Sequence, residues 1–191
     1  MICTIERGFA LWQTRLLLLL GRRRAALQRV TRRLERHPND LYALATRAHL
    51  RAEWGDKPAA LEDFLRLVQL APAQASAWFN LGFLSEALGL LAQAEAAFVR
   101  AIELDPALDR AWYGLALCLI AQRRLDEALL ALRRNTELQP LSPYGWYQMA
   151  RVQVDRQQPE EAARLIRHLR SFEPKVAAQL ERETGLGQTR A

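Results

Sequence analysis

Cysteine and lysine are scarce in this sequence, and a disulfide framework is not indicated. The 191 residues include two cysteines, Cys3 and Cys118, which lie far apart and fit no metal-binding spacing. Because small secreted scaffolds depend on many cysteines, we expect a reducing, cytoplasmic location. Of the 27 basic residues only Lys57 and Lys175 are lysines, and the others are arginines.

The sequence also lacks a long apolar run at its N-terminal end. The apolar stretch there is interrupted by polar residues, and its unbroken part, Leu16–Leu20, is five residues long. A membrane-spanning helix needs about 20. A secretory signal would place basic residues before the apolar run, whereas the cluster Arg22–Arg24 follows it. We therefore expect a cytoplasmic protein, with peripheral attachment to the inner face of a membrane as the alternative.

Catalytic and cofactor-binding motifs are absent as well. The sequence has no nucleophile elbow, phosphate-binding loop or dinucleotide fingerprint. His37, His49 and His168 lie far apart, and no cysteine or carboxylate stands at metal spacing beside them. The acidic pairs Asp126-Glu127 and Glu160-Glu161 fall at the starts of predicted helices, where they complement the helix dipole. We expect no enzyme activity, no cofactor and no bound metal.

Positive charge is concentrated in the first 36 residues. This segment holds nine arginines against Glu6 and Glu35, for a net charge of +7, and the rest of the chain has a net charge of −1. Any electrostatic attraction for an anionic partner must therefore arise in this segment.

Three columns of residues recur with a period of 34. The prolines of the first column are Pro38, Pro72, Pro106, Pro140 and Pro174. Tryptophans share the period at Trp78, Trp112 and Trp146, and alanines share it at Ala26, Ala60, Ala94, Ala128 and Ala162. A fixed period of this length predicts an all-α solenoid of helix–turn–helix repeats.

The period divides the chain into six segments. Residues 1–40 form a divergent basic N-terminal hairpin, with predicted helices at Ile5–Leu20 and at about 24–36. The array 41–176 contains four clear repeats, at 41–74, 75–108, 109–142 and 143–176. Residues 175–191 read as a closing helix, which ends at the glycines Gly185 and Gly187, followed by a frayed tail.

The chain resembles a tetratricopeptide repeat protein. The family pattern has Trp, Leu and Gly in the first helix of each repeat, and Ala, an aromatic, Ala and Pro in the second. Here Trp78, Leu81 and Gly82 match it, followed by Ala94, Phe98, Ala101 and Pro106. Residues 41–174 resemble the family well and 7–40 poorly. The resemblance implies a right-handed superhelical solenoid, closed by a capping helix, that acts as a scaffold or adaptor.

Small residues in the repeats are expected where the two helices of a hairpin cross closely. They form two columns, which are Ala48, Gly82, Ala116 and Ala150, and the alanines already named. The tryptophans are expected to fill space between repeats, so that truncating a buried Trp112 to Ala would lower stability by about 3–5 kcal/mol. Cys118 shares the apolar face of Leu115, so we expect it in the core.

The first helix of each repeat lines the concave surface in this family. The resemblance thus implies a partner-binding groove formed by Tyr42, Thr46, His49, Phe79, Asn80, Phe83, Arg110, Tyr113, Leu117, Tyr144, Tyr147, Gln148 and Arg151. Tyr and Phe provide large contact areas at low entropic cost, which suits an extended or helical segment of a partner protein with apolar anchors. The alternative for each aromatic residue is packing against the neighbouring repeat.

One known activity of the family is disfavoured by the sequence. Members that bind acidic chaperone tails use a clamp of two Lys, two Asn and one Arg. The matching positions here are Ala45, His49, Asn80, Arg110 and Gly114, of which only Asn80 keeps the pattern and Arg110 stands in for a Lys. We therefore do not expect a chaperone-tail receptor.

The helix predicted at about 24–36 has two faces. Leu27, Val30 and Leu34 lie on one side, and a different arc holds Arg22, Arg29, Arg32, Arg33 and Arg36. This basic patch is predicted to be a solvated outer face, or else a contact with an anionic membrane, nucleic acid or acidic protein. No aromatic residues interleave the arginines, which argues against single-stranded nucleic acid. The alternative function is thus an assembly factor at a membrane surface or on nucleic acid, and a homo-oligomer through the N-terminal helix is also open.

Overall fold

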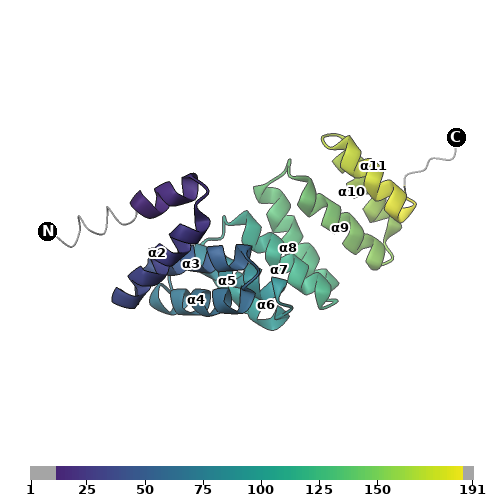
Figure 1. The fold of residues 1–191 in the computed structure, drawn as a ribbon. Coiled ribbons are helices and arrows are strands. Elements are labelled where there is room, and N and C mark those ends of the chain that lie inside the picture. Colours follow the sequence, from purple (N-terminus) through teal and green to yellow (C-terminus); the bar gives the residue numbers. More distant parts are fainter. Residues whose placement is uncertain (1–11, 187–191) are drawn as a thin grey trace. The chain divides into compact units, whose positions relative to one another are not determined.

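Every regular element in the described part of the chain is a helix. The structure, a computed structural model, describes residues 12–186 (Figure 1). Within these residues a helical segment at 12–19 is followed by α2 (Arg23–Arg36), α3 (Leu41–Glu53), α4 (Lys57–Leu70), α5 (Ala75–Ala87), α6 (Leu91–Leu104), α7 (Asp109–Ala121), α8 (Leu125–Leu138), α9 (Pro143–Asp155), α10 (Pro159–Arg170) and α11 (Pro174–Thr184). The predicted all-α class is confirmed, and α11 is the expected closing helix. Cys3, Gly187 and residues 5–11 of the predicted first helix lie outside the described residues.

The chain divides into two compact units, one ending at Gly89 and the other beginning at Leu90. In the first unit α2 packs on α3, α3 on α4 and α4 on α5. In the second unit each helix from α6 to α11 packs on the next, and α11 also contacts α9. Each helix thus contacts its sequence neighbours within its unit, as expected for stacked helical hairpins.

Both predicted small columns are buried. Ala48, Ala116 and Ala150 are fully buried, and so are the five alanines from Ala26 to Ala162. Thr14 lies 34 residues before Ala48 and is 2% exposed, so the first hairpin is built on the same positions as the later ones. The prediction that Cys118 belongs to the core is also confirmed.

The tryptophan and proline columns are joined by a hydrogen bond. The indole Nε1–H of Trp78 donates to the carbonyl of Pro72 at 2.9 Å. Trp112 and Trp146 donate in the same way to the carbonyls of Pro106 and Pro140, at 3.0 and 2.8 Å. The three tryptophans are half-buried rather than fully buried, because this polar edge of the indole reaches a loop. The bond ties the start of one hairpin to the end of the hairpin before it.

The turn inside each hairpin requires a left-handed backbone. Residues with positive φ between consecutive helices are Gly21, Gly55, Gly89, Arg123 and Gln157, again 34 residues apart, with φ of +68°, +87°, +75°, +62° and +61°. Glycine adopts this conformation without strain, whereas a side chain at Arg123 or Gln157 crowds the backbone. The last two turns therefore keep the geometry of the earlier ones at the expense of local strain.

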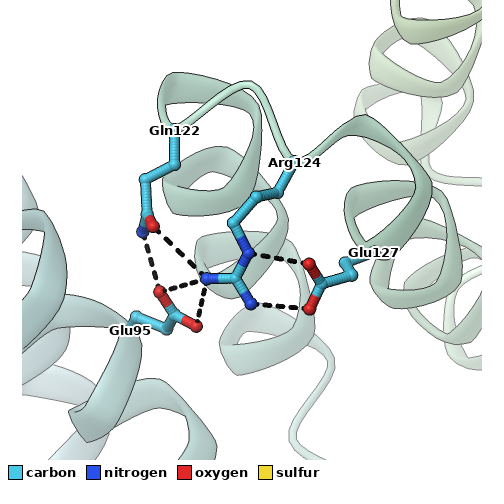
Figure 2. A network of polar contacts seen from close by, with 4 residues as sticks. All are labelled: Glu95, Gln122, Arg124 and Glu127. Carbon is cyan, nitrogen blue, oxygen red and sulfur yellow. Dashed lines mark hydrogen bonds and ion pairs between the residues drawn. The ribbon is translucent and has the colours of Figure 1, made fainter.

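A polar network surrounds the strained turn between α7 and α8 (Figure 2). The Arg124 guanidinium donates from Nη1 to both Glu95 oxygens at 2.7 and 2.8 Å, and from Nε and Nη2 to Glu127 at 2.7 and 2.6 Å. Gln122 Nε2 also donates to Glu95, at 2.8 Å. These bonds lower the pKa of Glu95, chiefly through Gln122, and the pKa of Glu127, chiefly through Arg124. The network fixes this turn against α6.

Gln157→Gly is expected to stabilise the chain by about 0.5–1 kcal/mol. The change removes the strain of a left-handed residue that carries a side chain. This gain is partly offset by the larger conformational entropy that glycine has in the unfolded chain. The matched control is Gly89→Ala, which introduces the same strain. A Cβ built at Gly89 meets no described atom within 4 Å, so only the backbone conformation opposes the change. Urea unfolding should show a higher midpoint for Gln157→Gly and a lower one for Gly89→Ala. A lower midpoint for Gln157→Gly would contradict the strain argument.

Trp112→Phe removes the indole donor to Pro106 while keeping a large ring, and we expect a loss of about 1 kcal/mol. Trp112→Ala also removes the packing and should destabilise by about 3 kcal/mol, the low end for a large aromatic residue. Trp54→Phe is the control, because Trp54 is exposed and lies outside the tryptophan column. Equal unfolding free energies for wild type and Trp112→Phe would show that the bond contributes nothing.

Candidate functional site

The residues predicted to bind a partner lie on the first helices of the hairpins. In the first unit α3 carries Tyr42, Thr46 and His49, and α5 carries Phe79, Asn80 and Phe83. In the second unit α7 carries Arg110, Tyr113 and Leu117, and α9 carries Tyr144, Tyr147, Gln148 and Arg151. None of these side chains is fully buried, so each has surface to offer a partner.

In the first unit α3 and α5 meet through a polar pair beside two stacked rings. The amide nitrogen of Asn80 lies 3.5 Å from His49 Nε2. One turn apart on α5, the rings of Phe79 and Phe83 stack with centroids 6.3 Å apart, and Phe83 is 61% exposed. The structure thus brings His49 and Asn80 together, with an exposed apolar ring on the same helix as Asn80.

The environment of His49 lowers the pKa of its imidazole and so favours the neutral form. Partial burial lowers the pKa of its imidazole, and the nearby carboxylate of Glu53 only partly opposes this. The buried Phe64 ring and the imidazole pack edge to face, with centroids 5.2 Å apart. A neutral Nε2 can accept the amide proton of Asn80, which leaves the Asn80 oxygen available as an acceptor.

The α3–α4 hairpin that presents His49 is held by a buried ion cluster. Asp63 of α4 is buried and accepts two bonds from Arg47 of α3, at 2.9 Å from Nε and 2.5 Å from Nη2. Arg51 donates a third bond to Asp63 at 2.9 Å. Because a buried carboxylate without its partners is very unfavourable, this cluster favours a single arrangement of the two helices.

In the second unit packing dictates the residue at one of the clamp positions, Gly114. A Cβ at Gly114 would lie 2.5 Å from the ring of Phe98, so α7 can approach α6 only with glycine here. Tyr113 packs in part against the core formed around Ala116 and Leu132. Tyr144, at 68% exposure, is the most accessible ring of the predicted set on α9.

The predicted groove residues Tyr147 and Arg151 contact the closing helix. The Tyr147 hydroxyl donates to Glu183 of α11 at 2.6 Å, and Arg151 Nη1 lies 3.9 Å from the same carboxylate. The bond from Tyr147, with a smaller contribution from Gln179, lowers the pKa of Glu183. Sequence reasoning missed Glu183, because no residue pattern links it to α9. A partner at this end must either include this contact or displace it.

The predicted basic patch is not uniformly a solvated face. Arg33 donates to Asp40 at 2.6 Å from Nε and 2.5 Å from Nη2, and Asp40 also caps the start of α3. Arg33 is therefore a structural residue that joins α2 to α3. Arg22, Arg32 and Arg36 are exposed, and Arg29 is half-buried.

No helix within residues 12–186 is long and apolar enough to cross a bilayer. The same residues contain no group of three or more His, Cys, Asp or Glu side chains that could hold a metal ion.

Comparison with protein families supports the repeat assignment. A sequence model of the tetratricopeptide repeat matches residues 45–109 and 84–143, which together span just over half of the chain. No curated protein matches the sequence.

Several solved structures share the fold. MamA protein superimposes with a TM-score of 0.82 and 19% identity, over 95% of this chain and 97% of that one. YrrB, described as a repeat protein of this type with an unusual peptide-binding site, gives 0.79 and 19%, over 88% of both chains. PilW, a type IV pilus biogenesis factor, gives 0.77 and 20%, over 95% of this chain and 87% of that one. At these identities the likeness shows the fold alone.

Tyr147→Phe is expected to weaken the attachment of α11 to α9, because it removes the donor to the ionised Glu183. The Glu183 pKa is lowered on folding, so this contact stabilises the protein above the ordinary carboxyl pKa and is lost as the pH falls below it. The difference in unfolding free energy between wild type and Tyr147→Phe should be present at about pH 6 and smaller at about pH 3.5. Tyr113→Phe is the control, and its effect should not depend on pH. A Tyr147→Phe effect of equal size at both pH values would contradict the assignment.

Proposed function

Because this chain belongs to the tetratricopeptide repeat family, we propose that it is a non-catalytic scaffold or adaptor that binds a peptide or helical segment of a partner protein. The binding residues are those predicted on the first helices α3, α5, α7 and α9. The partner segment carries apolar anchors rather than the acidic tail of a chaperone. The predicted cytoplasmic location stays a prediction.

The observation that carries the proposal is the α3–α5 surface of the first unit. An exposed aromatic ring, Phe83, stacks with Phe79 on the same helix as the His49–Asn80 pair. An aromatic anchor on a rigid helix supplies contact area at a low entropic cost. Beside it, the Asn80 oxygen can accept a backbone N–H of a bound segment. This combination of an apolar contact and an amide suits a peptide better than a small metabolite.

The second unit supplies one exposed aromatic ring and one half-buried amide on the first helix α9. Tyr144 is its most exposed ring of the set, and Gln148 follows one turn later on α9. Both can contact a partner without disturbing the core. Tyr147 and Arg151 contribute to a site that includes Glu183, so this end of the surface is mixed in charge.

A catalytic role lacks support at this surface. His49 pairs with an amide, and a catalytic histidine would need a nucleophile or a carboxylate in that position. The half-buried Glu95 accepts hydrogen bonds from Gln122 and Arg124, and the exposed Glu127 accepts from Arg124, which explains their lowered pKa values without chemistry.

The test uses one exposed ring from each unit. Phe83→Ala and Tyr144→Ala, singly and together, should leave the fold intact and lower affinity for the partner by about tenfold or more per anchor. Partners are identified by affinity capture from the native cells and mass spectrometry, and the bound segment is mapped on peptide arrays. Affinities for that segment are then measured by surface plasmon resonance.

The control double variant is Leu130→Ala/Leu141→Ala. These leucines are equally exposed, but Leu130 lies on a second helix and Leu141 in a loop. A partner that is lost with the aromatic variants and kept with the control supports the proposal. Retention of every partner by the folded Phe83→Ala/Tyr144→Ala variant would refute it.

A further inference from the structure

The arginines of α2 fall into two groups when their positions are compared with the corresponding positions of the later repeats. Arg32 belongs to a column that is basic in every repeat, at Arg66, Arg100, Arg134 and His168, so it needs no special explanation. Arg36 occupies a column that is otherwise apolar, at Leu70, Leu104, Leu138 and Phe172. Arg29 stands where Asp63, Ala97, Ala131 and Leu165 follow, three of them apolar. Positive charge in these two columns is specific to the first hairpin.

These arginines line a concave pocket of about 620 Å³. Its wall is formed by Leu17 from the segment 12–19 and by one face of α2 with the residue after it, namely Ala25, Gln28, Arg29, Arg32, Arg33, Arg36 and His37. A pocket of this size accommodates one small molecule or one lipid headgroup, and a peptide helix is too large for it. Every ionisable side chain in its lining is basic.

Most of the positive charge in the pocket is not compensated within residues 12–186. Arg33 is neutralised by Asp40, but Arg29, Arg32 and Arg36 form no ion pair with a described carboxylate. The Nε of Arg29 is buried and has no hydrogen-bond acceptor among the described residues. Because a buried donor without an acceptor is unfavourable, an anionic group in the pocket would relieve it.

An exposed apolar surface lies on the segment that forms the other wall. Thr14 faces inward, whereas Leu19 is 84% exposed and Trp12, Leu16 and Leu20 are exposed as well. These four residues fall on one side of the helix, and Leu17 of the same segment reaches the pocket. Exposed apolar side chains and unpaired arginines thus occupy one short helical hairpin.

We propose that this hairpin docks on an anionic phospholipid surface. The pocket takes the phosphate of one headgroup through Arg29, Arg32 and Arg36, and Trp12, Leu16, Leu19 and Leu20 enter the boundary between headgroups and acyl chains. A nucleic acid could bind the arginines through its phosphates, but it would not bury the exposed leucines. This membrane attachment is independent of the peptide-binding surface on α3, α5, α7 and α9.

The test is flotation of the full-length chain with vesicles at low salt. Vesicles of phosphatidylglycerol and phosphatidylcholine should bind the chain, and vesicles of phosphatidylcholine alone should not. Arg29→Gln/Arg36→Gln should lower partitioning on the order of 30-fold, given the usual contribution of each arginine near an anionic surface. The matched control Arg66→Gln/Arg100→Gln removes the same charge from exposed positions and should bind nearly as well as the wild type.

A second pair of variants tests the apolar contact. Leu19→Gln/Leu20→Gln should reduce vesicle binding several-fold, and Leu130→Gln/Leu141→Gln, also at exposed positions, should not. In addition, anionic vesicles should shift the tryptophan emission to shorter wavelength in the wild type, and the shift should be smaller in Trp12→Phe.

Several outcomes would overturn the proposal. One is the absence of binding to anionic vesicles at low salt, and another is an equal loss with the Arg66→Gln/Arg100→Gln control. Saturable binding of glycerol phosphate or of duplex DNA without vesicle binding would assign the pocket to a soluble phosphate or to nucleic acid instead. Sedimentation that shows a dimer abolished by Leu19→Gln/Leu20→Gln, with no vesicle binding, would assign the apolar surface to self-association.

Discussion

The close approach of the two helices of a hairpin within each unit is the constraint on which the rest of the structure depends. Two columns of small residues recur every 34 residues and are buried throughout, from Thr14 and Ala26 to Ala150 and Ala162. A larger side chain in either column would separate the helices and expose the apolar residues above and below. The left-handed turn follows from this constraint, because the chain must reverse within a few residues for the helices to meet. Arg123 and Gln157 keep that backbone despite the strain.

The sequence was sufficient to predict the fold because packing repeats with the period. The proline, tryptophan and alanine columns were visible, but the bond between the first two was not predicted, since periodicity places residues in register without saying what they contact. The positions with a left-handed backbone are also only partly evident from the sequence. Gly21, Gly55 and Gly89 suggest them, whereas Arg123 and Gln157 carry no such signal, and only the shared spacing identifies them once the backbone is known.

The candidate site was less predictable because recognition residues need not repeat. First helices could be assigned from the period, so the helices that bear the site followed from the sequence. Which side chains remain accessible depends on neighbours that differ from hairpin to hairpin. Phe83 is exposed, Gly114 is required because the ring of Phe98 lies against it, and the hydroxyl of Tyr147 is hydrogen-bonded to Glu183. The pairing of His49 with Asn80 joins residues 31 apart, and no motif marks it.

The helices at the two ends of the described chain differ in the surfaces that they present. At the C-terminal end α11 covers the last hairpin with Ala177 and Leu180 and satisfies Tyr147 and Arg151 through Glu183. At the other end α2 has arginine at Arg29 and Arg36, where the later repeats are mostly apolar. If α2 faced only water, any polar side chain would be suitable at these positions. A mixture of positive and negative side chains would also avoid repulsion between like charges. The buried Nε of Arg29 has no acceptor among the described residues, and Leu19 is exposed on the adjoining segment, so two features that are each unfavourable in water lie in one hairpin. A surface that is both cationic and apolar is stabilised where an anionic, partly apolar phase meets it, and this is the physical basis for the proposal that this end docks on a lipid surface.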